Sequence, residues 1–537
     1  MTIDAKDKDD KVEVTLKDVN IDASSRSEAA VSVTGKGDTT IELDGDNELK
    51  SGAGHAGLEH NKTDTSGELT IQDKDNNGSL EAAGGFKGAG IGSAGSNDAQ
   101  VKITGGNITA TSDDWGAGIG SGSYGTGTVE ITGGEINATG GYLGAGIGGG
   151  CNGSGNVTIS GGTITAAGSD GAAGIGGGYY NGATVTITGD AVIKNASSTK
   201  YGAGIGGGNG SDGNVTISGN AKIENATGGY GAAGIGGGAF SSPDKIGNGN
   251  VVIKDNAKID NVQGGAYGAG IGGGIYGLSN VTIEGNTKVN ATGGAGGAAI
   301  GGGAGAENNS DNNGNQITIK SNENGSPTIN AVGGGTDEGE KIVIGGAGIG
   351  AGCESDADAD ITLEGKVTIT ATAGKDNVAI GANGIEQEFS GLAEGSSITR
   401  YDSEGNDTSL PGDKVPVTPV VPDDTSSGGS ADASVQESVF PGLVVTDKDG
   451  QRISYTSIRG NNVLSLRVGR FTASLRASLA TLRQLRAEGI DTITFQTILC
   501  STTLSVDELL AMGGEDTEVV LTHHIRSSML TVGGKAV

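Results

Sequence analysis

The chain has 537 residues, a formal net charge of −30, 107 glycines and only 3% aromatic residues. This length allows several hydrophobic cores, but so few large side chains exclude one conventional globular core and favour a thin core repeated many times. The negative charge, nearly all of it before residue 440, argues against nucleic acid or anionic lipid as a partner.

The opening residues, MTIDAKDKDDKVEV, contain no hydrophobic signal segment. No apolar run approaches the length that spans a bilayer, so we expect no membrane insertion. On this basis the protein is either cytoplasmic or has lost an export signal. The cysteines, Cys151, Cys353 and Cys500, are too few and odd in number for a disulfide framework.

A glycine-rich unit of the type GAGIGGG recurs from residue 88 to residue 381. Its central isoleucines mostly lie 28–31 residues apart, with two longer intervals. They are Ile91, Ile119, Ile147, Ile175, Ile205, Ile235, Ile271, Ile300, Ile349 and Ile380. Each period also holds an alternating strand such as NVTIS at 156–160 and a second strand such as GGTITAA at 161–167.

Three short strands per period, without helices, predict an all-β fold: a right-handed parallel β-helix, or solenoid, with about 28–30 residues per coil. Neighbouring coils should lie ~4.8 Å apart, so Val157, Ile159 and Ile164 should stack on their counterparts. Glycine permits the tight corners of a narrow coil. Each isoleucine is then the single side chain of its wall that points into the core. We expect this domain to occupy residues 1–390.

Residues 391–439 are rich in Pro, Ser, Gly and Asp and are predicted to form a linker. Residues 440–537 alternate strand-like and helix-like runs, which predicts a small C-terminal α+β domain whose partner the sequence does not specify. One apolar helical stripe is expected in FTASLRASLATLRQLRAEG, formed by Leu475, Leu479, Leu482 and Leu485. His523 and His524 should lie in one strand and point to opposite faces.

The aromatic residues keep fixed distances from the G-I-G isoleucines. Four or five residues before an isoleucine lie Phe86, Trp115, Tyr142, Tyr201, Tyr230 and Tyr267. Five residues after one lie Tyr124, Tyr180, Phe240 and Tyr276. Stacked coils would align them in two lines flanking the glycine wall, where flat rings among Asn, Thr and Asp suit the apolar faces and hydroxyls of sugars. The alternative is that the rings only shield the core at the corners.

A calcium site is a second possibility, in DKDNNGSLE at 73–81. Asp73, Asp75 and Asn77 would supply oxygen ligands on a tight turn made by Gly78. The twelfth position is Gly84 rather than glutamate, which excludes an EF-hand. An ordinary Asp/Asn turn explains the same pattern.

The stretch VTLKDVNIDASS…AAVSVTGKGDTTIELDGDNELKSGAG, followed by GAGIGGG…NVTISGGTITA, resembles carbohydrate-binding-domain β-helix proteins of clostridial and related gut bacteria. The resemblance covers about residues 11–390. It implies an extracellular or cell-surface protein that binds a polysaccharide, such as a plant cell-wall or mucin-like glycan, in some members with calcium.

Together these observations lead us to expect a non-catalytic, polysaccharide-binding or adhesin-like β-solenoid. One alternative is a structural spacer that displays the tail domain. A second is a polysaccharide lyase or glycoside hydrolase. Residues 61–399 contain no His and no Arg, and Asp113 and Asp114 are adjacent and should face opposite ways, so this pattern disfavours catalysis.

Overall fold

The computed structural model describes residues 1–240, 245–308, 314–336, 344–416, 443–448, 450–453, 455–459, 462–468, 470, 472–497, 500–515, 517–524 and 528–536. The chain divides into two compact units, Met1–Val420 and Val421–Val537, and each is considered by itself. None of the described helices is long and apolar enough to cross a membrane.

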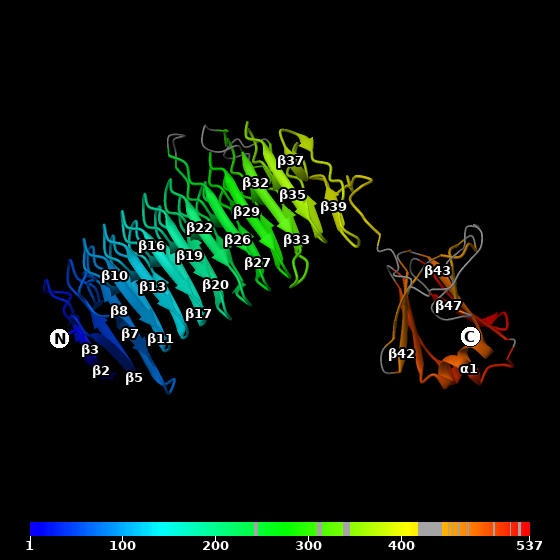
Figure 1. Ribbon diagram of the computed structural model, residues 1–537, viewed down its shortest axis with the longest axis horizontal. Coiled ribbons are helices and arrows are strands. Elements are labelled where there is room, and N and C mark those ends of the chain that lie inside the picture. Colours follow the sequence, from blue (N-terminus) through cyan, green and yellow to red (C-terminus); the bar gives the residue numbers. More distant parts are fainter. Residues whose placement is uncertain are drawn as a thin grey trace, which may run out of the picture. The chain divides into compact units, whose positions relative to one another are not determined.

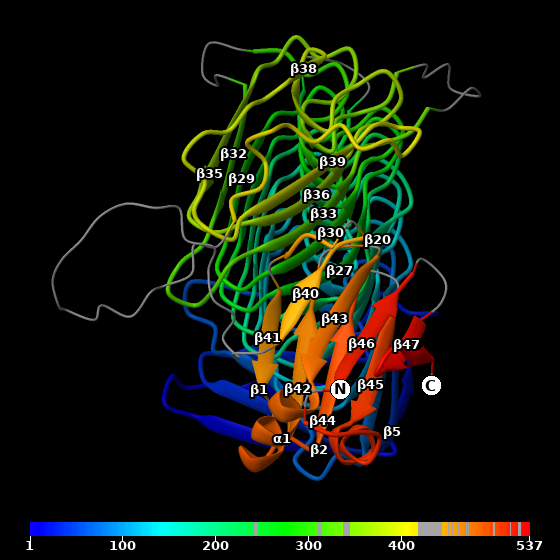
Figure 2. The same ribbon diagram turned by 90° about the vertical axis from the view of Figure 1, so that its right-hand side faces the viewer.

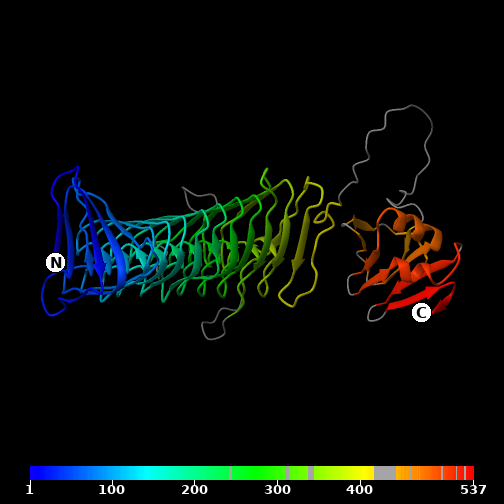
Figure 3. The same ribbon diagram turned by 90° about the horizontal axis from the view of Figure 1, so that it is seen from below.

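The first unit is a parallel β-solenoid in which each coil contributes a strand to each of three walls (Figures 1 and 3). The wall that holds the G-I-G units is sheet A. It consists of β1 Thr2–Ala5, β4 Val31–Gly35, β6 Leu58–Glu59, β9 Ile91–Gly92, β12 Ile119–Gly120, β15 Ile147–Gly148, β18 Ile175–Gly176, β21 Ile205–Gly206, β25 Ile235–Gly236, β28 Ile271–Gly272, β31 Ile300–Gly301, β34 Ile349–Gly350, β37 Ile380–Ala382 and β38 Ile385–Glu386.

Sheet B holds the alternating strands that follow each glycine unit. It consists of β2 Lys11–Lys17, the first part of β5 Asp38–Lys50, β7 Leu69–Gln72, β10 Ala99–Ile103, β13 Gly127–Ile131, β16 Gly155–Ile159, β19 Ala183–Ile187, β22 Gly213–Ile217, β26 Gly249–Ile253, β29 Ser279–Glu284, β32 Asn315–Lys320 and β35 Ala359–Glu364.

Sheet C holds the second strand of each period. It consists of β3 Asn20–Asp22, the second part of β5, β8 Gly78–Gly84, β11 Asn107–Ser112, β14 Glu135–Thr139, β17 Thr163–Gly168, β20 Val192–Ser198, β23 Lys222–Ile223, β24 Ala226–Thr227, β27 Lys258–Gln263, β30 Lys288–Thr292, β33 Thr328–Val332, β36 Thr368–Thr372 and β39 Ser397–Tyr401.

The core is a set of apolar columns along the solenoid axis, as the sequence predicts. In β16, residues alternate between buried and exposed, so Val157 and Ile159 point inward while Thr158 faces solvent. Ile147, Ile175 and Ile205 pair directly across successive coils of sheet A and are fully buried. The view in Figure 2 shows the coils superimposed on one another. The expected stacking of equivalent residues one period apart is therefore confirmed.

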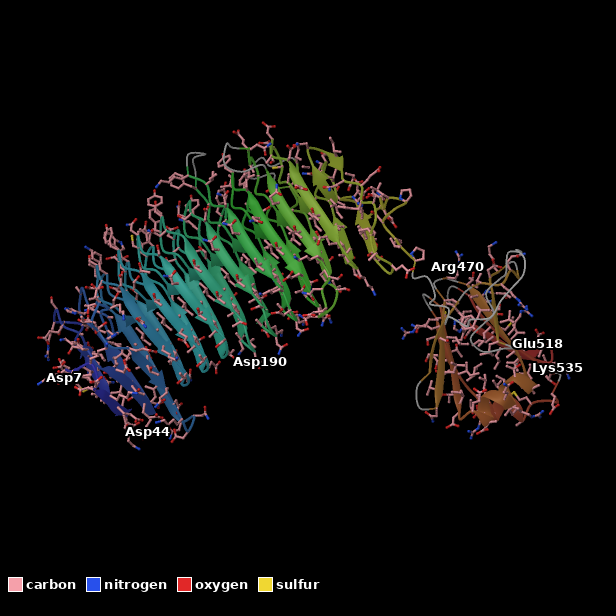
Figure 4. All side chains as sticks on the ribbon, viewed as in Figure 1. Asp7, Asp44, Asp190, Arg470, Glu518 and Lys535 are labelled. Atoms are coloured by element: carbon pink, nitrogen blue, oxygen red, sulfur yellow. The ribbon has the colours of Figure 1, made fainter. Side chains whose placement is uncertain are left out.

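The turn between sheets B and C carries a polar ladder that runs from coil to coil. Asn220 donates its side-chain amide to Asp190 at 3.0 Å, and Asn286 donates to Asn256 at 3.1 Å. Asp44 and Asp190 lie along this edge of the solenoid (Figure 4). Such ladders satisfy polar groups at the turn without contributing to the apolar core.

Coil stacking begins at the first residues of the expected segment and extends beyond its C-terminal end. β1 already pairs with β4, although the repeat is recognisable only from about residue 11. β39 pairs with β36, so residues 397–401 form a coil instead of the linker predicted for 391–439. Pairing aligns the side chain of Arg400 with that of Ala371, at the inward column. The rest of that predicted linker, from residue 417 to residue 439, lies outside the described residues.

Arg400 closes the solenoid at this end by a buried ion-pair group. The Arg400 side chain is fully buried and donates from Nε and Nη2 to Asp413 at 2.8 and 2.9 Å. It also donates from Nη1 to Glu386 at 2.5 Å. Burial by itself lowers the pKa of the guanidinium, but the two carboxylates outweigh it and hold this pKa above its usual value.

The second unit is an α+β domain with two sheets. One contains β40 Val444–Thr446, β43 Ala473–Ser478, β46 Glu518–His523, β47 Ser528–Val532 and β48 Lys535–Ala536. The other contains β41 Thr456–Arg459, β42 Val463–Arg467, β44 Thr492–Gln496 and β45 Ser501–Ser505. The described helices are α1 Leu479–Ala487 and α2 Val506–Leu510.

The helical stripe predicted in this domain is partly wrong. Leu475 lies in β43, while Leu479, Leu482 and Leu485 are the buried residues of α1. The helix starts only after Ser478, whose hydroxyl accepts the backbone N–H of Thr481 at 3.2 Å. His523 is buried and His524 is exposed, so the two rings point to opposite faces, as expected.

Candidate functional site

Each G-I-G unit folds as a narrow loop whose isoleucine side chain is buried in the core. In one coil, the N–H of Ala173 donates to the carbonyl of Gly177 at 2.9 Å, which closes the loop below the buried Ile175. The same bond recurs in the next coil between Ala203 and Gly207. The glycine wall is therefore a row of tight loops rather than a flat strand surface. In each loop, the chain segments before and after the isoleucine both end in a corner at the surface.

Most corners share one backbone conformation. We define the leading corner as the fourth residue before a G-I-G isoleucine and the trailing corner as the fifth residue after it. Leading corners with positive φ are Lys87, Trp115, Leu143, Gly171, Tyr201, Gly231, Tyr267, Gly296 and Asp376. Trailing corners with positive φ are Ser96, Tyr124, Asn152, Tyr180, Gly210, Tyr276, Gly305 and Glu354. Left-handed backbone is thus typical of the corners and occurs with many residue types, although exceptions include Phe240 and Gly345.

The two kinds of corner lie side by side. The N–H of Cys151, next to the trailing corner of its coil, donates to the carbonyl of the leading corner Trp115 at 2.7 Å. Ala239 donates in the same way to Tyr201 at 2.7 Å. The sequence places the two aromatic lines on either side of a glycine wall; because that wall folds into loops, the lines adjoin on one edge. We call this surface the corner edge.

Most of the predicted ligand-binding rings contact one another along the corner edge. Ring centroids are 5.2 Å apart for Phe86 and Trp115, 6.1 Å for Tyr201 and Tyr230, and 5.7 Å for Tyr230 and Tyr267. Tyr142 joins Trp115 through the backbone, since its carbonyl accepts the Trp115 N–H at 3.0 Å.

The rings of the trailing side are less continuous. Tyr180 and Phe240 have centroids 5.6 Å apart although they lie two coils apart, with Gly210 between them. A Cβ on Gly210 would lie 3.1 Å from the Cβ of Phe240. Tyr276 lies over Gly305, and Tyr124 is 59% exposed. Glycine corners thus make room for the ring of a neighbouring coil.

Three residues of this edge are not identified by sequence reasoning. Tyr179, one residue before a trailing corner, has its ring centroid 3.9 Å from that of Tyr180. The Lys87 ammonium lies 5.2 and 5.1 Å from the ring centroids of Phe86 and Trp115, and the Lys245 ammonium lies 3.9 Å from that of Tyr180. The only sequence signal for Tyr179 is its distance from the preceding isoleucine. It lies four residues after Ile175, whereas the repeated aromatic spacing is five.

The corner edge also concentrates buried polar atoms that lack a hydrogen-bond partner among the described residues. Six such side-chain atoms occur in the described part of the solenoid, and four belong to residues beside the corners: Asp114, Ser123, Asp170 and Asn209. Burial, followed by the nearby Asp113 carboxylate, raises the pKa of Asp114. Unpartnered polar groups at such positions mark places for water or for a ligand's hydroxyl groups.

The thiol on this edge is not an activated nucleophile. Cys151 is buried, and this burial raises the pKa of its thiol to about 11. It therefore stays protonated at neutral pH, and a protonated thiol is a weak nucleophile. Cys353 behaves in the same way, with a pKa raised to about 11 by burial.

The predicted calcium ligands form a well-bonded turn. Both oxygens of Asp73 accept backbone N–H groups, from Asn77 at 3.1 Å and from Gly78 at 2.9 Å. The side-chain amide N–H of Asn77 donates to the Asp75 carboxylate at 2.9 Å, so the NH₂ group of Asn77 faces Asp75. The carboxylates that come within 4.8 Å of one another are those of Asp73, Asp75 and Glu42. Glu42 lies one coil earlier. The Lys74 ammonium is 3.5 Å from the Glu42 carboxylate and supplies a positive charge next to it.

Comparison with protein-family models gives a match to a beta helix repeat over residues 101–123, 129–151, 157–179 and 215–239. Each matched segment runs from the first inward valine of a sheet B strand to the residue just before a trailing corner. These four segments therefore carry a beta helix repeat, in agreement with the stacked coils. No match is found among curated proteins or solved structures.

Proposed function

We propose that the solenoid is a non-catalytic, extracellular polysaccharide-binding protein, and that the aromatic side chains of the corner edge bind the glycan. The observation that carries the proposal is the placement of large rings at left-handed corners. Trp115, Tyr201 and Tyr267 have φ values of 65°, 55° and 71°. A residue with a Cβ is disfavoured in this conformation by about 1–2 kcal/mol.

The same corner closes without a ring in other coils. Gly171, Gly231 and Gly296 occupy the leading corner with φ between 76° and 85°. Folding of a coil therefore does not require an aromatic residue there, and a glycine would avoid the strain. Strained residues that the backbone does not need are typical of surfaces with a binding role. This favours a ligand over mere shielding of the core.

The chemistry of the edge suits a sugar chain. Tyr142 and Tyr124 are more than half exposed, and flat exposed rings offer apolar surface to the C–H faces of pyranoses. Neighbouring Asp, Asn and Ser side chains with unpartnered oxygens offer hydrogen bonds to hydroxyl groups. The excess of acidic residues opposes strongly anionic polymers, so a largely uncharged plant cell-wall or mucin-like glycan is the best fit.

Replacing Tyr201 with glycine and Tyr230 with alanine should weaken glycan retention by about tenfold, given roughly 0.5–1.5 kcal/mol for each stacked ring. Thermal stability should stay unchanged or rise slightly, because glycine relieves the strain at residue 201. Affinity electrophoresis in gels containing xylan, mixed-linkage β-glucan or gastric mucin, together with thermal melting, measures both effects.

Thr216→Ala is the matched control, because Thr216 faces outward from sheet B. Its retention should equal that of the wild type. If the ring variant melted several degrees lower and kept full retention, the rings would be structural, and the spacer role would become the better account. Release of reducing or unsaturated ends from any of these polymers would instead favour the enzyme.

A further inference from the structure

We infer that the ligand is a long linear glycan that lies along the solenoid axis, and that Tyr179 is a binding residue that makes its track continuous. The inference rests on the proposed polysaccharide-binding function and concerns the shape of the ligand. A branched or terminal sugar epitope would need one or two rings only. The structure instead provides one ring in every coil over a long segment.

The row is continuous from the coil of Ile91 to the coil of Ile271. In these seven successive coils, the rings beside the leading corner are Phe86, Trp115, Tyr142, Tyr179, Tyr201, Tyr230 and Tyr267. Coils in a parallel stack lie ~4.8 Å apart, so the row extends over roughly 30 Å. Only a polymer that follows the axis can contact rings along that whole length.

The coil of Ile175 is the one coil in this segment without an aromatic residue four or five positions before the isoleucine. Asp170 and Gly171 occupy those positions. The ring that fills the gap comes from the other arm of the same loop. A Cβ built on Gly171 would lie 2.5 Å from Cδ2 of Tyr179, so the Tyr179 ring takes the space above this glycine.

Tyr179 is fixed in this place from several sides. Its N–H donates to the carbonyl of Leu143 in the preceding coil at 3.1 Å. Burial, a hydrogen bond with the Tyr180 phenol and the nearby Tyr142 phenol raise the pKa of Tyr179, so its phenol stays neutral. The ring therefore lies between the leading corners Leu143 and Gly171 of two coils, and it closes a gap that would otherwise divide the row into two groups of three rings.

Tyr179→Ala should change how affinity depends on ligand length. The probes are xylo-oligosaccharides and cello-oligosaccharides from the disaccharide to the octasaccharide, titrated by calorimetry into the full chain. For the wild type, affinity should rise along the series, because each added sugar contacts a further ring of a continuous track. For Tyr179→Ala, the trisaccharide should bind as before, while the octasaccharide should lose about tenfold.

Thr216→Ala is the control, since this side chain faces outward from sheet B and lies away from the corner edge, and it should keep the rise with length. Tyr179→Phe should also behave as the wild type, because the ring and its packing remain. If wild-type affinity did not increase beyond the trisaccharide, or if Tyr179→Ala kept the full increase, the linear track would be wrong while glycan binding would stand. If the wild type bound none of these oligosaccharides and none of the polymers, both proposals would fall.

Discussion

Replacement of Asp413 with alanine is expected to destabilise the last coils of the solenoid by about 3–5 kcal/mol, because it leaves the buried guanidinium of Arg400 without its bidentate partner. The Arg400 side chain has no solvent exposure and Asp413 is 1% exposed, so water cannot replace the lost carboxylate. Glu386 would remain as a single acceptor. Because solenoid coils are stabilised mainly by their neighbours, the loss should appear first in β37 and β39.

Hydrogen exchange of the backbone amides measures this local effect. Protection of residues 397–401 should fall by roughly two to four orders of magnitude in Asp413→Ala, because the expected loss is about 3–5 kcal/mol. Glu404→Ala, an exposed position in the same segment, should change stability by less than about 0.5 kcal/mol. The pair Arg400→Met with Asp413→Leu should recover most of the loss, since apolar residues can replace a buried ion pair. Unchanged protection in Asp413→Ala would show that the ion-pair group does not close the solenoid.

Replacement of Gly176 with alanine should destabilise the central coils by on the order of 3 kcal/mol or more, from backbone strain and overpacking together. Gly176 has a φ of 140°, a conformation that residues with a Cβ rarely adopt. A Cβ there would lie 2.0 Å from the carbonyl oxygen of Gly206 in the next coil. Every G-I-G isoleucine in the chain is followed by glycine with a similar φ, between 129° and 148°.

The matched control for this variant is Gly174→Ala, on the other side of Ile175. A Cβ on Gly174 would lie 2.5 Å from the backbone nitrogen of Ser197, but Gly174 has no positive φ, and Ala299 and Ala379 occupy the equivalent position in two later coils. We expect a clearly smaller loss, and chemical denaturation monitored by circular dichroism would compare the two variants. If both alanines had equal effects, the positive φ after the isoleucine would not be the constraint that keeps glycine in this place.

Much of the solenoid follows from the sequence because its rule is simple. Parallel strands place residues one period apart in register. Ile147 and Ile175 are one repeat period apart in the sequence, and this is enough to predict that they stack. Alternation within NVTIS is enough to assign which side chains point inward. The fixed distance of the aromatic residues from the isoleucines likewise predicts that they form rows, before any coordinates are known.

The parts that sequence reasoning misses depend on contacts that a repeat does not encode. The bond from Ala173 to Gly177 bends the glycine wall into a loop and brings the two corners together, and it involves only backbone atoms. Tyr179 differs from the repeat spacing by one residue and reaches its place through the small volume of Gly171. Glu42 joins Asp73 only because register places it one coil earlier.

Charge is the reason that the closing coil is not predicted. An arginine in a segment rich in Asp, Ser and Gly is typical of a solvated linker, and its burial requires two carboxylates that follow no motif. The helix in the tail domain shows a similar limit. Leu475 and Leu479 have helical spacing, but the strand in which Leu475 lies pairs with β46, and this pairing decides its conformation.

The most direct test of the proposed function is the fluorescence of Trp115 during titration with polysaccharide. Trp115 is the single tryptophan of the chain and lies at a leading corner of the ring row, beside Phe86. Titration of the full chain with xylan, mixed-linkage β-glucan and gastric mucin should give a saturable shift of its emission with at least one polymer. The double variant Tyr201→Gly with Tyr230→Ala should need a higher concentration to reach the same shift. An emission spectrum that stays unchanged at saturating concentrations of all three polymers would contradict glycan binding on the corner edge.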